Sequence, residues 1–112
     1  QPVVMRKDER VEISLPHWKA KIYLLVRGTQ GKRMQPFYTI ISPRGGSKGL
    51  YSHEGEEFGL VLKGELEIDL NGMKHRVKEG ESFYFSSQIP HSWSNPTDRE
   101  TVVVWVVSPP TW

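Results

Sequence analysis

The dipeptide Asn71-Gly72 is the feature of this sequence that most restricts its fold. Both central residues of a type I′ turn need a positive φ, which asparagine and glycine tolerate best. The flanking segments 65–70 and 73–78 alternate between apolar and polar side chains, as β-strands do. The pattern predicts an antiparallel hairpin with one face in a protein core, while the acidic residues of the first strand face water. The core-facing residues of that strand are Leu66, Ile68 and Leu70.

Short strands are predicted along most of the chain, and no segment has a convincing helical pattern. The predicted strands cover residues 11–15, 21–27, 37–42, 56–63, 65–70, 73–78, 82–85 and 101–107. Strands of this length and spacing are typical of a β-sandwich or β-barrel. Two segments, 58–62 and 102–107, are apolar on both faces, so we expect either the N-terminal strands or a second subunit to cover their outer side.

Composition narrows the class of protein further. A chain of 112 residues is long enough for one folded domain. It has no cysteine, which excludes disulfides and thiolate metal sites, and no apolar run near the roughly 20 residues of a membrane helix. The net charge of +2 is too small to indicate nucleic-acid binding. We expect a soluble, cytoplasmic domain without membrane or direct DNA contact, and the initial Gln1 suggests a piece of a longer polypeptide or a processed chain.

The segment 45–64 resembles the first motif of the cupin superfamily, which reads Gly, five residues, His-x-His, three or four residues, Glu, six residues, Gly. The matching positions here are Gly45, His53, Glu57 and Gly64, and Tyr51 replaces the first histidine.

The segment 80–95 resembles the second cupin motif, which reads Gly, five residues, Pro-x-Gly, two residues, His, three residues, Asn. Gly80, His91 and Asn95 match it, whereas Ser86 and Gln88 stand at the Pro and Gly positions. Two such motifs in order, separated by a hairpin, are a specific signal.

This resemblance implies an all-β cupin fold, which is a double-stranded β-helix or jelly-roll barrel. We expect a single cupin domain over residues 1–112, with a barrel core at about 34–108 and residues 1–20 as an N-terminal arm or edge strand. The resemblance also implies that His53, Glu57 and His91 point into one pocket. Two imidazoles and a carboxylate suit divalent iron, manganese, nickel or zinc and leave coordination positions open.

Other interpretations of these three residues stay open at the level of sequence. His53 could be an ordinary loop histidine, and Glu57 could be one surface carboxylate of an acidic run. His91 follows a proline and could cap a loop. Tyr51 and Trp93 are predicted to form the pocket wall, because ionising a phenol with a reference pKa near 10 would be costly for metal ligation.

Two further histidines are assigned no chemistry. His75 is predicted to be a strand residue opposite Ile68 on the hairpin, and His17 a loop or edge residue. No nucleophile elbow is present, so hydrolysis through a nucleophilic serine has no support.

A narrower resemblance concerns function. Residues 3–10, 53–67 and 107–110 look like the C-terminal cupin half of bacterial regulators of the XRE family, which carry an N-terminal helix-turn-helix. This implies a sensor domain that binds a small-molecule effector and forms a homodimer, with DNA contacted by a helix-turn-helix before Gln1. The alternatives are a stand-alone metal-dependent cupin enzyme, of the dioxygenase or isomerase type, and a metal-free module whose histidines bind an anion.

Overall fold

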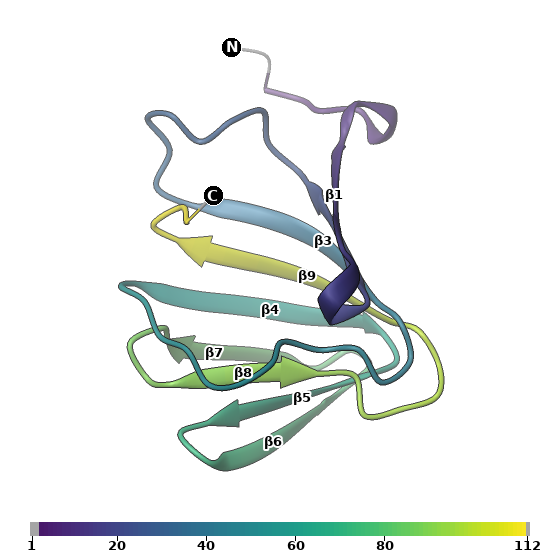
Figure 1. Cartoon of the computed structure of the whole chain (residues 1–112). Coiled ribbons are helices and arrows are strands. Elements are labelled where there is room, and N and C mark those ends of the chain that lie inside the picture. Colours follow the sequence, from purple (N-terminus) through teal and green to yellow (C-terminus); the bar gives the residue numbers. More distant parts are fainter. Residues whose placement is uncertain (1–2, 112) are drawn as a thin grey trace.

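The computed structural model describes residues 3–111, which form two facing antiparallel sheets (Figure 1). The larger sheet has the strand order β1-β2-β3-β9-β4-β7, and the smaller has the order β6-β5-β8. The strands are β1 (Val11–Leu15), β2 (Ala20–Leu24), β3 (Gln35–Ile41), β4 (Glu56–Lys63), β5 (Glu65–Leu70), β6 (Met73–Lys78), β7 (Ser82–Ser86), β8 (His91–Ser94) and β9 (Thr101–Ser108). Over these residues the only helical turns are the 3-10 segments η1 (Lys7–Glu9) and η2 (Pro16–Trp18). The all-β prediction is therefore confirmed.

None of the helical turns within residues 3–111 has the length and apolar character needed to cross a bilayer.

The predicted hairpin is formed by β5 and β6. Asn71 and Gly72 have φ values of 52° and 96°, as a turn of this type requires. The Gly72 amide donates to the Asp69 carboxylate at 2.7 Å, which fixes the turn further. Ile68 pairs with His75, and the core-facing side chain of Ile68 is buried, as the alternation predicted.

One strand near the second motif was not predicted. Strand β8 begins directly after Pro90 and pairs with β5 through Leu70–His91 and Ile68–Trp93. Its four residues include two serines, so its composition has little strand character. On its other side lies the segment 46–51, which reaches β8 through isolated bridges, including one between Tyr51 and His91.

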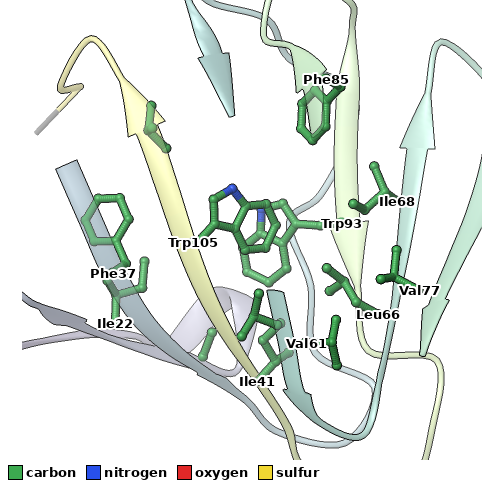
Figure 2. Packing of buried hydrophobic residues seen from close by; sticks show 13 residues of the cluster. Ile22, Phe37, Ile41, Val61, Leu66, Ile68, Val77, Phe85, Trp93 and Trp105 are labelled. Carbon is green, nitrogen blue, oxygen red and sulfur yellow. The ribbon is translucent and has the colours of Figure 1, made fainter. Parts of the chain in front are cut away.

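The core lies between the two sheets (Figure 2). Inward side chains of both sheets form one apolar cluster, in which the two indoles of Trp93 and Trp105 meet near the centre. The remaining buried members are Ala20, Ile22, Phe37, Ile41, Val61, Leu66, Ile68, Val77, Phe85, Val103 and Val107. A single cluster shared by both sheets is what a closed barrel provides.

The N-terminal strands do not cover the outer side of the larger sheet. Strands β1 and β2 continue that sheet beyond β3. Phe58 and Leu62 on β4 are each 44% exposed, and the neighbouring Tyr84 on β7 is 64% exposed. We expected either the N-terminal strands or a second subunit to cover this outer side, and within residues 3–111 the N-terminal strands do not cover it.

Asn95, at the end of the second motif, is a structural residue. Its buried amide group donates to the carbonyls of Ile41, Ser42 and Arg99, and its oxygen accepts from Thr97. These bonds join the loop after β8 to the end of β3. Buried polar groups of this kind fix one chain path, because each would be costly to leave unpaired.

Candidate metal centre

Three side chains from different segments converge at one end of the barrel. His53 lies in the loop before β4, Glu57 is the second residue of β4, and His91 is the first residue of β8. The Nε2 atoms of His53 and His91 lie 2.9 Å and 3.1 Å from the same Glu57 oxygen, Oε2. One potential ligand atom from each residue lies within 4.8 Å of the others. The structure thus brings together the residues that the sequence named as metal ligands.

Backbone carbonyls orient both imidazole rings. His91 Nδ1 lies 2.7 Å from the Ile89 carbonyl oxygen, and His53 Nδ1 lies 3.1 Å from that of Glu54. A carbonyl only accepts hydrogen bonds, so each Nδ1 carries the proton. In the neutral ring the lone pair is then on Nε2, which is the atom that faces Glu57. Carbonyls that fix the tautomer in this way are the usual support of histidine metal ligands.

The Nε2 atom of His91 is an orphaned buried polar atom. It is inaccessible to solvent, and in the neutral ring it has no hydrogen to donate to Glu57 Oε2, 3.1 Å away, so it has no hydrogen-bond partner among residues 3–111. A lone pair that faces a carboxylate is unfavourable, and either a proton or a metal ion would relieve it. A metal ion would also serve His53 and Glu57, and nitrogen and oxygen donors are suitable ligands for it. The residues present therefore fit a divalent transition metal.

Glu57 is held as a carboxylate inside the barrel. Its side chain is 4% exposed; Oε1 accepts from Trp105 Nε1 at 2.8 Å, and Oε2 accepts from Ser87 Oγ at 2.9 Å. Burial favours the neutral acid, but the hydrogen bonds of His91, Trp105 and Ser87 outweigh it and lower the pKa of Glu57. The interior thus keeps a carboxylate anion at the candidate metal centre.

The same contact acts on His91 in the opposite direction. Burial opposes the imidazolium, but the bonds to the Glu57 carboxylate and the Ile89 carbonyl outweigh it and raise the pKa of His91. Without a metal, the buried carboxylate favours a proton on His91. A metal ion would have to displace that proton.

Tyr51 lies beside the three residues as part of the wall. Its backbone exchanges two hydrogen bonds with His91, and the two ring centroids are 4.5 Å apart. Its hydroxyl accepts from Trp93 Nε1 at 3.1 Å. Burial raises the pKa of Tyr51, so the phenol stays protonated. Tyr51 and Trp93, which the sequence assigned to a ligand pocket, line one cavity together with His53.

A cavity of about 360 Å³ opens at this end of the barrel. Tyr51 is part of its lining together with Trp18, Ile22, Phe37, Thr39, Ser52, His53, Glu57, Trp93, Trp105, Val107 and Thr111. This lining is mostly apolar, with His53 and Glu57 as its ionisable groups apart from the phenol of Tyr51. A concave apolar site with a few convergent polar groups is the usual form of a small-molecule pocket.

Several residues of this site were missed by sequence reasoning. Trp105 belongs to the apolar core cluster, yet it also donates to Glu57. Ser87 follows β7 and lies two residues after Phe85, the residue paired with Glu57. Side chains two residues apart on a strand point to the same face of the sheet. Had the pairing of β4 with β7 been predicted, Ser87 would have been placed on the same face as Glu57. Trp18 had no such signal, because η2 reaches the cavity from far outside both motifs.

Comparison with known proteins supports both the fold and a relation to regulators. Over 93 residues the chain is 29% identical to the HTH-type transcriptional regulator PuuR of Escherichia coli, covering 83% of this chain and 49% of that protein. The chain thus spans about half the length of the curated relatives it matches.

Two of the solved structures that share the fold show its range. The cupin domain of an XRE family transcriptional regulator from Enterobacter cloacae has a TM-score of 0.72 and 21% identity, covering 83% of this chain and 99% of that one. The polyketide cyclase RemF from Streptomyces resistomycificus has a TM-score of 0.79 and 18% identity, covering 98% of this chain and 83% of that one. The fold is therefore shared by regulators and enzymes.

The family is decided by a third comparison. The family model of the cupin domain matches residues 37–107, which run from β3 to β9 and include both motifs and the three converging side chains. The chain belongs to the cupin family.

Proposed function

We propose that this chain is the small-molecule sensor domain of a bacterial XRE-family transcriptional regulator, with a divalent metal in its pocket. The observation that carries the proposal is the convergence of His53, Glu57 and His91 at the end of an apolar cavity. Similarity to PuuR and to the cupin domain from Enterobacter cloacae supports the regulatory context. The cavity provides the space that an effector needs.

The metal would be held by the two Nε2 atoms and the Glu57 carboxylate. Three protein ligands leave positions on iron, manganese, nickel or zinc for solvent or effector, where the metal supplies Lewis acidity and positive charge. The protein's own part is to fix the tautomers through the carbonyls of Glu54 and Ile89 and to keep Glu57 ionised.

Metal analysis tests this directly. Protein purified without chelator or an affinity-column metal should contain about one equivalent of metal, and His91→Ala should lose it while remaining folded. His75→Ala is the matched control, because His75 is an exposed histidine on β6 outside the cluster. A wild-type chain that stays empty and takes up no offered metal would favour the anion-binding module instead.

A homodimer is the second element of the proposal. The outer face of β4, β7 and β9 carries a contiguous group of apolar side chains: Phe58, Leu60, Leu62, Tyr84, Val104 and Val106. A second copy in a closed two-fold contact would bury this face. Sedimentation at micromolar concentration should give a dimer, and Phe58→Lys should shift it to monomer. Met73→Lys, at an exposed apolar residue of β6, is the control.

DNA contact is assigned to another domain of the regulator. The chain has a net charge of +2, and residues 3–111 contain no α-helix that could enter a major groove. Gel retardation with promoter DNA should show no sequence-specific binding by these 112 residues. Specific retardation at modest salt would contradict this assignment.

An enzyme of the dioxygenase or isomerase type is the second candidate. It is favoured by the fold shared with the polyketide cyclase RemF and by an open cavity at the candidate metal ligands. A helix-turn-helix encoded in frame before Gln1 would support the regulator. Turnover by the metal-loaded chain, abolished in His91→Ala but not in His75→Ala, would support the enzyme.

A further inference from the structure

Three indoles form a continuous wall of the cavity. Trp18 and Trp93 meet edge to face with ring centroids 5.4 Å apart, and Trp93 and Trp105 are 5.7 Å apart. Trp105 reaches the Glu57 carboxylate, whereas Trp18 is only half buried. The wall thus runs from the candidate metal ligands toward solvent, and it offers aromatic surface along its length.

Two of the three indole N–H groups of this wall are already engaged. Trp93 Nε1 donates to the Tyr51 hydroxyl, and Trp105 Nε1 donates to Glu57. Glu57 also accepts from Ser87, and in the proposed site its carboxylate binds the metal, so its charge is neutralised there and is not available to an organic cation. Among residues 3–111 no lysine or arginine lines the cavity, and apart from the indoles, His53 and Glu57 the polar side chains there carry hydroxyls. A charged group on a ligand therefore has one partner, the metal.

The charge at the metal end selects the sign of that group. A divalent cation with one carboxylate and two neutral imidazoles leaves a net positive site, which attracts an anion and repels an ammonium group. A second charge on the ligand would lie against indoles without a partner, which is costly. The rest of the ligand gains most by being flat and unsaturated, because aromatic faces and edges pack on one another favourably.

We propose that the pocket takes a flat, largely apolar monocarboxylate, with its carboxylate at the metal and its unsaturated body along Trp93 and Trp18. This inference rests on the proposed metal site. Trp18 is then a specificity-determining residue that η2 contributes from outside residues 37–107, the part matched by the family model.

Four small probes of similar size separate the elements of this proposal. Cinnamate has a flat body and one carboxylate, 3-cyclohexylpropanoate keeps the carboxylate without flatness, cinnamamide removes the charge, and cinnamylamine reverses it. Calorimetric titration of the metal-loaded chain should give cinnamate about tenfold tighter binding than 3-cyclohexylpropanoate, the scale of one or two aromatic contacts. Cinnamamide should bind more weakly still, and cinnamylamine should not bind.

Removal of the metal is the second part of the experiment. Protein treated with EDTA should lose cinnamate binding and regain it when metal returns, with metal content measured in the same samples. If metal binds and cinnamate shows no preference over cinnamylamine, the ligand class is wrong while the metal site stands. If no metal binds, both proposals fail. If the metal-free chain binds cinnamate equally well, the ligand assignment fails even with a metal present.

Variants of two aromatic residues locate the contact. Trp18→Ala should weaken cinnamate binding several-fold and remove its advantage over 3-cyclohexylpropanoate, with metal content unchanged. Tyr23→Leu is the control, because Tyr23 does not line the cavity. It lies on β2 between Ile22 and Leu24, whose side chains pack with the core. Equal loss in both variants, or none in Trp18→Ala, would overturn the role of Trp18. Tryptophan emission that responds to cinnamate in wild type and less in Trp18→Ala would support it.

Discussion

Strand β4 runs from one end of the barrel interior to the other, and the side chains around it are polar at one end and apolar at the other. Glu57, Gly59 and Val61 project to the same side of the strand. At one end Val61 pairs with Val103, and both are fully buried members of the apolar core. At the other end Glu57 is equally enclosed but is surrounded by indole, hydroxyl and imidazole groups. One alternation of side chains thus builds both a packed core and a polar site.

The difference shows how a barrel separates stability from function. The packed end gains free energy from apolar burial, which is about 25 cal/mol per Å². The open end places a carboxylate and a buried histidine where apolar side chains would be cheaper to bury. Its polar atoms are held by hydrogen bonds and, in our proposal, by a metal. On β4, the carboxylate of Glu57 at an inward position is therefore the departure from the apolar pattern that marks the site.

The largest expected effect is at the packed end. Leu66→Ala should lower the free energy of unfolding by about 2–5 kcal/mol, because Leu66 is fully buried and its loss leaves a cavity. Chemical denaturation measures this. Metal content per folded chain should stay unchanged, since Leu66 is not among the converging ligands. Loss of metal by the folded variant would show that the two ends are not separable.

Gly59, midway between the two ends, gives the next effect. A Cβ added there would lie 2.1 Å from Cζ of Phe83, so the ring must move. Gly59→Ala should cost about 1–3 kcal/mol of unfolding free energy through overpacking. Combining it with Phe83→Leu in a double-mutant cycle should give a loss smaller than the sum of the single losses. Strict additivity would mean that the ring is not the obstacle.

The packed end and the hairpin could be predicted from sequence, because their causes are local. Asn71 and Gly72 encode the turn, and the alternation of Leu66 and Ile68 encodes a buried face. Both signals depend only on residues a few positions apart.

The site depended on more than local pattern. The convergence of His53, Glu57 and His91 was available only through the motif resemblance, because strands β5, β6 and β7 lie between Glu57 and His91 in the chain. Strand β8 was missed because its short polar sequence has low strand propensity, and it is extended because it pairs with β5. Trp18 was missed because nothing near it in sequence indicates that η2 reaches the cavity.

The pH dependence of the free energy of unfolding tests the polar end of the barrel. Without metal, the raised pKa of His91 contributes stability that is complete below the usual histidine value and is lost as pH rises through its folded-state pKa. The lowered pKa of Glu57 contributes stability that is present above the usual carboxylate value and is lost as pH falls through its folded-state pKa. Both contributions are therefore complete only between the usual carboxylate and histidine values.

Metal binding has the opposite dependence over the histidine range, because its ligands must be deprotonated. The stabilisation by added metal should grow from about pH 6 to about pH 8. At tenfold excess over its dissociation constant the metal should add about 1.4 kcal/mol at the upper end of this range. Thermal unfolding with metal and with EDTA measures the difference. His91→Ala should show little difference at any pH, and a wild-type difference that shrinks as pH rises would contradict a histidine-ligated metal.

The smallest expected effect separates a wall residue from a ligand. Tyr51→Phe removes the hydroxyl that accepts from Trp93 Nε1 and should cost about 0.5–1.5 kcal/mol of unfolding free energy, the net value of one hydrogen bond. Because burial keeps the phenol neutral, metal content and metal affinity should change little. Glu57→Gln is the comparison variant, since it removes the anionic ligand at nearly constant volume and should abolish metal binding. If Tyr51→Phe lost the metal as completely as Glu57→Gln, the hydroxyl at the position of the first motif histidine would be a ligand after all.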